Sequence, residues 1–168
     1  MHDVFIRYSV DKLTQLAGRI DTCLDKLDDE QIWWRGADES NAVGNLALHL
    51  NGNLWQWIVS AVGGAPETRD RDAEFNAAGG VTKAELQSRL RERVAETVAV
   101  FERLTPERLM ERVHVQSYHV TVLEAVYHVV EHFAQHAAQI MYATKLMARI
   151  DLGFYGHLKA ASHAEKTP

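Results

Sequence analysis

Residues 121–150 read TVLEAVYHVVEHFAQHAAQIMYATKLMARI, and they decide the fold because they predict one long amphipathic helix. Thr121 and Glu124 have the spacing of a capping box, which marks a helix start. Apolar residues then recur every three or four positions, and Gly153 follows the last of them. The inward face consists of Val122, Val126, Val129, Phe133, Ala137, Ile140, Thr144 and Met147. We therefore expect a helix from Thr121 to about Ile150.

Three other stretches have the same periodicity. They are residues 4–27, residues 41–62 with Ser40 as the cap, and the stretch from Thr82 to the break at Pro106. No run alternates apolar and polar residues as a half-buried strand does. We expect an all-α fold in which four helices form a bundle around one core.

The connections between these helices differ in length. Residues 63–81 could span roughly 60 Å, which exceeds the ~33 Å of the second helix. The second and third helices can therefore run parallel, joined by a long crossover. Within it, we interpret residues 67–74 as a solvated loop, and we expect irregular structure between Pro106 and Thr121.

Composition narrows the class of protein. The 168 residues suit one domain at 1–156, with a loose tail at 157–168. The formal charge of -5 argues against nucleic-acid binding, which needs a basic face. Cys23 is the single cysteine, and its apolar neighbours predict a buried side chain rather than a nucleophile. With no apolar run of ~20 residues and no signal-peptide pattern at the start, we expect a soluble cytoplasmic protein.

Three histidines lie at four-residue spacing on the last helix, as His128, His132 and His136. Neighbours at this spacing share a helix face, so a pair can offer two imidazole nitrogens to one ion. Advancing ~100° per residue places His136 about 50°, His132 about 90° and His128 about 130° from the centre of the apolar face. We therefore predict His132 and His136 as ligands and expect His128 to face water.

A third ligand is predicted in the second helix, where His49 is the one histidine. It lies about 12 Å into that helix, at a depth that matches the middle of the last helix. Three imidazoles leave one divalent ion, Zn²⁺ or Ni²⁺, with an open position for water or a substrate. Residues that could orient the ligands or a substrate are His128, Asn45, Asn53 and Gln139.

Three segments together carry a resemblance to a known family. They are SNAVGNLALHLNGN at residues 40–53, WQWI at residues 55–58 and YHVVEHFAQHAAQI at residues 127–140. The chain resembles the DinB-like (DNA-damage-inducible) family over nearly all of residues 3–152, and its uncharacterised members most closely. In one departure, Ala138 precedes Gln139 where many relatives have glycine.

The resemblance implies an up-down-down-up bundle, often a homodimer, that binds a divalent metal through His49, His132 and His136. Characterised relatives include YfiT-like thiol S-transferases, which use bacillithiol or mycothiol. They also include a mycothiol-dependent isomerase. A small-molecule substrate, such as a low-molecular-weight thiol, is therefore one expectation. The aromatic residues around the second helix also favour a homodimer, because one bundle leaves them incompletely covered.

Several rival sites fail on spacing. Glu111-x-x-His114 is the only di-iron-like motif, and it lies outside the long helices. Neither a zinc-protease motif nor a phosphate-binding loop is present. Two classes remain open: a metal-dependent S-transferase or hydrolase, and a non-catalytic metal-binding or dimeric interaction bundle. Residues left with two interpretations, in a pocket or merely structural, are His114, His119, Trp33, Trp34, Trp55 and Trp57.

Overall fold

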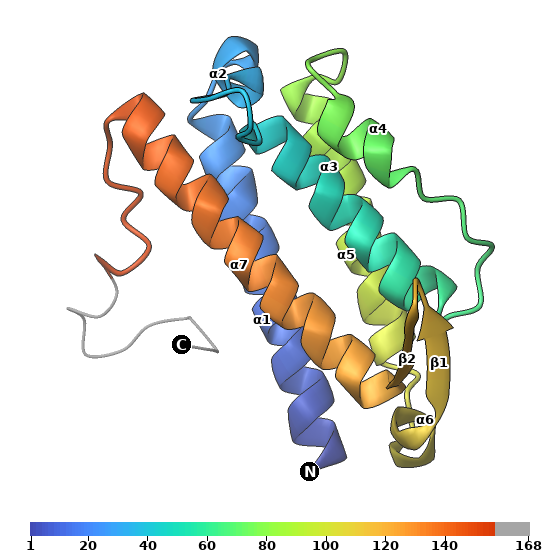
Figure 1. The fold of residues 1–168 in the computed structure, drawn as a ribbon. Coiled ribbons are helices and arrows are strands. Elements are labelled where there is room, and N and C mark those ends of the chain that lie inside the picture. The colour runs from blue at the N-terminus through green and yellow to red at the C-terminus, as the bar shows by residue number, and fades with distance from the viewer. Residues whose placement is uncertain (157–168) are drawn as a thin grey trace.

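The computed structural model describes residues 1–156, which form a mostly helical body (Figure 1). Its long helices are α1 (His2–Asp25), α3 (Val43–Leu54) with the π-helix η1 (Trp55–Ser60) at its end, α5 (Lys83–Phe101) and α7 (Val122–Ala148). Its shorter elements are α2 (Asp29–Trp33), α4 (Arg71–Asn76), α6 (Pro106–Met110) and the strands β1 (Arg112–Val115) and β2 (Tyr118–Thr121). The predicted tail at 157–168 lies outside the described residues.

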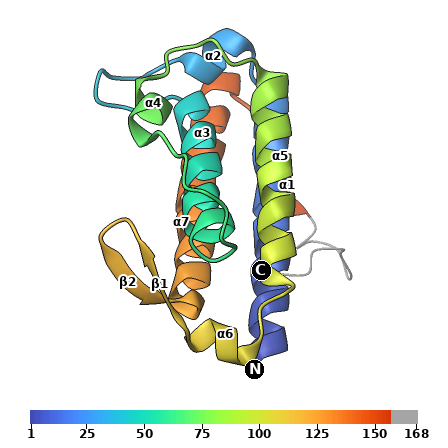
Figure 2. The ribbon, with the colours of Figure 1, turned by 90° about the vertical axis from the view of Figure 1, so that its right-hand side faces the viewer.

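The long helices enclose one core. α1 packs against α5 and α7, and α3 packs against the same two helices. Figures 1 and 2 show α1 and α7 running upward and α3 and α5 running downward. Phe101 of α5 and Phe133 of α7 are among the largest fully buried side chains. Within residues 1–156, every helix falls short of the length or the apolarity that a bilayer span requires.

The helix starts follow from the caps, with one correction. Glu124 donates its backbone N–H to the Thr121 hydroxyl, and the Glu124 carboxylate accepts from the Thr121 N–H at 2.7 Å, as predicted. The predicted cap at Ser40 is wrong, because its hydroxyl bonds to Ala37 and α3 begins only at Val43. There, Asn45 Oδ1 accepts from the N–H of Ala42 at 3.0 Å and so caps the helix from within.

Two segments predicted as irregular are ordered. The first is an antiparallel hairpin between α6 and α7, in which His114 is paired with His119. Its four-residue strands are too short to give a clear alternation in the sequence. The second is α4, which packs along α3 (Figure 2) and buries Glu74. The interpretation of residues 67–74 as a solvated loop is therefore wrong for residues 71–74, which are helical and include the buried Glu74, whereas residues 67–70 are irregular and mostly exposed.

Candidate metal centre

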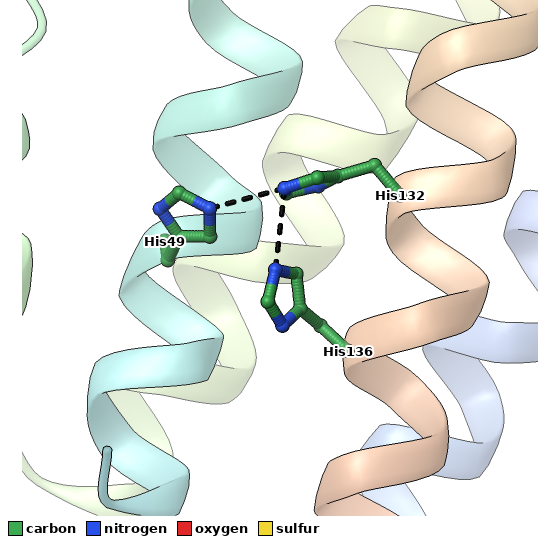
Figure 3. A group of neighbouring side chains, drawn as sticks. All are labelled: His49, His132 and His136. Atoms are coloured by element: carbon green, nitrogen blue, oxygen red, sulfur yellow. Dashed lines mark hydrogen bonds between the residues drawn. The ribbon is translucent and has the colours of Figure 1, made fainter. Parts of the chain in front are cut away.

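Three histidines from two helices converge between α3 and α7 (Figure 3). His132 Nε2 lies 3.1 Å from His49 Nε2 and 3.2 Å from His136 Nε2. One ligand atom of each residue lies within 4.8 Å of the others, so the group could hold a metal ion. Two nitrogens that share a tetrahedral Zn²⁺ at ~2.1 Å stand about 3.4 Å apart, close to these separations.

The proton positions in this cluster favour a cation. His49 Nδ1 lies 3.0 Å from the Glu74 carboxylate, which only accepts, and 3.0 Å from Arg69 Nη2, which already donates to that carboxylate at 2.8 Å. A proton on His49 Nδ1 therefore donates to Glu74, and one on His136 Nδ1 donates to Gln139 Oε1 at 2.7 Å. When neutral, both rings therefore direct Nε2 lone pairs toward His132. A proton on His132 Nε2 can satisfy only one of them. His132 Nδ1 is buried and has no hydrogen-bond partner among the described residues. The donor set therefore fits a divalent cation bound at the three Nε2 atoms.

Two of the three rings resist protonation. Burial, reinforced by the neighbouring His136 and His49, lowers the pKa of His132 from 6.5 to about 3. Burial also lowers the pKa of His136, although its bond to Gln139 opposes the shift. Metal binding requires neutral imidazoles, so these rings are ready to coordinate at neutral pH.

Glu74 supports the His49 ring at Nδ1, a role that no sequence pattern predicted. Its carboxylate accepts from Arg69 Nε at 2.7 Å and from Arg69 Nη2 at 2.8 Å, besides His49. Burial alone would raise the pKa of Glu74, but the bonds from Arg69 and His49 lower it below the usual value. The carboxylate is therefore charged, and it fixes the His49 proton on Nδ1 so that Nε2 is free to bind a metal.

Gly52 makes room for this carboxylate. A Cβ at Gly52 would lie 1.8 Å from Glu74 Oε1 and 2.8 Å from Arg69 Nε. Only glycine lets the ion pair lie directly on the backbone of α3. A glycine inside a helix lowers the stability of the helix. Gly52 within the predicted second helix is therefore the sequence signal that could have indicated a close packing contact there.

Asn45 and Asn53, both predicted to orient a ligand or a substrate, have different positions. Asn45 Nδ2 donates to the carbonyls of Glu74 at 2.9 Å and Ala77 at 2.7 Å, so it holds the α4 segment rather than the His49 ring. Asn53 is buried and lines the cavity beside the histidines.

A cavity of about 800 Å³ opens beside His49 and His132. Gln56 and Trp57 of η1 are adjacent in sequence, yet both line it. The hairpin contributes Gln116, Tyr118 and Val120 from the far side. A candidate metal site beside an open cavity is the arrangement of catalytic rather than closed structural sites.

The prediction that His128 faces water is wrong. Its ring is half-buried, lines the cavity, and stacks 4.1 Å from the indole of Trp57. His114 and His119 are exposed and contact each other at 4.6 Å, and they do not line the described cavity.

The remaining candidates are mainly structural. Cys23 is buried, and burial raises the pKa of its thiol to about 11, which makes it a poor nucleophile. Trp57 lines the cavity, whereas Trp33 packs on Gly44 and Trp55 lies under the Arg93 guanidinium at 4.3 Å.

Solved structures with a similar fold include two bacterial proteins. A conserved protein from Enterococcus faecalis is 16% identical, with a TM-score of 0.68, covering 86% of this chain and 97% of that one. A DinB-like protein from Bacillus subtilis, YjoA, is 18% identical, with a TM-score of 0.67, covering 88% and 97%. At these identities the likeness concerns the fold alone.

No curated protein matches this sequence. One family model, described as a protein of unknown function (DUF1572), matches residues 1–154. The chain therefore belongs to the DUF1572 family.

Proposed function

We propose that this chain is a cytoplasmic metal-dependent enzyme that holds one divalent ion, Zn²⁺ or Ni²⁺, with His49, His132 and His136. Its four long helices form the up-down-down-up bundle of the DinB-like proteins. The reaction is small-thiol S-transfer or hydrolysis, as in the YfiT-like branch. The convergence of three Nε2 atoms beside an open cavity supports the proposal most strongly.

The ion would supply a hydroxide or thiolate nucleophile at neutral pH by lowering the pKa of a water or small thiol at its open position. The protein's own residues hold the site in place. Glu74 and Gln139 orient the His49 and His136 rings. Trp57 and His128 form an aromatic side of the cavity for the substrate. Because Cys23 is buried, the nucleophile comes from solution.

Metal analysis of purified variants tests the site. We expect about one ion per chain, lost in His49→Ala, His132→Ala and His136→Ala but retained in the matched control His128→Ala. Equal retention in all four variants would refute the ligand set. Turnover with low-molecular-weight thiols is then expected to vanish in His49→Ala and to persist in Cys23→Ala. Loss of turnover in a folded, metal-loaded Cys23→Ala would exclude an external nucleophile.

The alternative function is a non-catalytic bundle that forms a homodimer. Of the aromatic residues around the second helix, Trp34 is 58% exposed, whereas Trp57 is only 5% exposed. Support for the homodimer lies on α7, where Tyr127, Tyr142 and Leu146 are 61%, 67% and 60% exposed. Sedimentation at micromolar concentration tests it, and a monomer mass would dismiss it.

A further inference from the structure

Arg71 places a guanidinium beside the candidate metal centre. It is the first residue of α4 and lines the cavity that contains His49 and His132. The guanidinium lies over the Phe75 ring at 4.8 Å, and Phe75 in turn lies 4.7 Å from the His49 ring. Two successive ring contacts therefore separate this cation from a predicted metal ligand, and the stacking limits its freedom.

The charge of Arg71 is available to a ligand. Among the described residues, no carboxylate forms an ion pair with it. Arg69, which also lines the cavity, is committed to Glu74 and to Gln56 Oε1 at 3.0 Å. Glu124 lines the cavity too, but its carboxylate accepts from Thr121 in the capping box.

Aromatic rings form another part of the cavity lining. The ring of Trp57 lies 4.1 Å from that of His128 and 6.1 Å from that of Tyr118, tilted in both pairs, and all three residues line the cavity. A ligand in this cavity could thus contact aromatic rings, the predicted metal ligands His49 and His132, and the Arg71 guanidinium. Guanidinium binds planar oxyanions through two parallel hydrogen bonds.

We infer that Arg71 binds an anionic oxygen group of the substrate, joined through a short apolar or aromatic spacer to the end that reacts at the histidines. This inference rests on the proposed function, which supplies the reacting end. It restricts the substrate to carboxylates or phosphates with a hydrophobic centre, a few carbon atoms in length.

Calorimetric titration of the zinc-loaded protein tests the inference with three probes: 3-phenylpropionate, phenethyl phosphate and the neutral 3-phenylpropionamide. We expect the better anion to bind about tenfold more tightly than the amide, since a charge-assisted pair contributes on the order of 1.5 kcal/mol. The anion that binds more tightly shows whether Arg71 recognises a carboxylate or a phosphate.

Variants separate Arg71 from other causes. Arg71→Gln is expected to abolish the preference for the anion, and Arg71→Lys to retain part of it. Arg91→Gln removes a charge from a surface ion pair outside the cavity and should leave the preference intact. Circular dichroism confirms that each variant is folded.

Repeating the titration with metal-free protein distinguishes a failure of this inference from a failure of the proposed function. An anion held only by the metal would lose its preference when the metal is removed, whereas one held by Arg71 would keep it. If no metal binds, the proposed function fails, but the preference in the metal-free protein still decides the role of Arg71. Equal binding of anion and amide, a preference that survives Arg71→Gln, or no binding at millimolar concentration would each overturn the inference.

Discussion

Two segments border the same cavity, α4 with its preceding loop and the β1–β2 hairpin, and they are held in place very differently. Arg69 and Glu74 have side chains only 2% and 10% exposed, and Asn45 holds the segment to α3. The hairpin exposes most of its residues, and Gln116 at its turn reaches Gln56 at 2.8 Å. Buried polar contacts therefore hold the segment behind the candidate ligand His49, whereas the hairpin that lines the cavity is exposed.

Removing Glu74 should have the largest effect. Glu74→Ala leaves the Arg69 charge buried without its partner, at a cost of about 3–5 kcal/mol in unfolding free energy. Metal affinity should fall roughly 10–100-fold, because His49 loses its supporting carboxylate. Urea unfolding and metal titration measure the two effects. Glu67→Ala is the control, since its exposed carboxylate accepts only the backbone N–H of Arg69 in the described structure.

Gly52→Ala should disturb the same support without removing a charge. The new Cβ would displace the Glu74 carboxylate, with an expected loss of about 1–3 kcal/mol in unfolding free energy and weaker metal binding. Gly18→Ala in α1 is the control, because no atom lies within 4 Å of its Cβ position. That change should stabilise the protein by about 0.5–1 kcal/mol. Equal stability of both variants would mean that α4 does not need close approach to α3.

Lowering the pH tests His132, whose buried Nδ1 has no hydrogen-bond partner among the described residues. Burial and the neighbouring histidines lower the pKa of His132 to about 3. The unfolded chain therefore takes up the proton first, and stability falls as pH decreases from about 6.5 toward 3. Allowing for partial exposure, we expect metal-free protein to lose about 1–2 kcal/mol between neutral pH and pH 5. His132→Gln should show a shallower slope in urea unfolding, and an unchanged slope would contradict this assignment.

Gln116→Ala should have the smallest effect. It removes one exposed hydrogen bond to Gln56. The strain of the positive φ of 54° at this position is similar for glutamine and alanine, so it does not change. We expect less than about 0.5 kcal/mol in unfolding free energy and unchanged metal affinity. The affinity for a small ligand is the quantity that should change. A large loss of stability would show that the hairpin is as firmly integrated as α4.

The same contrast explains what could be predicted from the sequence. Helical periodicity and the Thr82 and Thr121 caps mark long segments, because many residues repeat one signal. The four-residue spacing and the depth along each helix indicated His49, His132 and His136, which the structure brings together. These patterns depend on spacing within one helix, which is the same in the sequence and in the folded protein.

Glu74 could not be found in this way, because its role depends on a contact between distant segments. It lies in a run of charged residues that resembles a solvated loop, and its signal was Gly52, one turn beyond His49. His128 was misjudged for a related reason. A helical wheel gives its direction on α7 but omits Trp57, which covers it.

The π-helix η1 lets a mutation change the cavity lining without changing the position of His49. Its wide turns, with the Ala61 N–H bonded to Gln56 O at 3.1 Å, accommodate one residue more than an α-helix would. Deleting a single codon within residues 55–60 would restore the α-helical i→i+4 spacing and change the directions of side chains inside that segment. Gln56 and Trp57 would change their direction, whereas His49 and Asn53 precede the change. Such a deletion would therefore alter the cavity lining and leave the candidate ligand His49 in place.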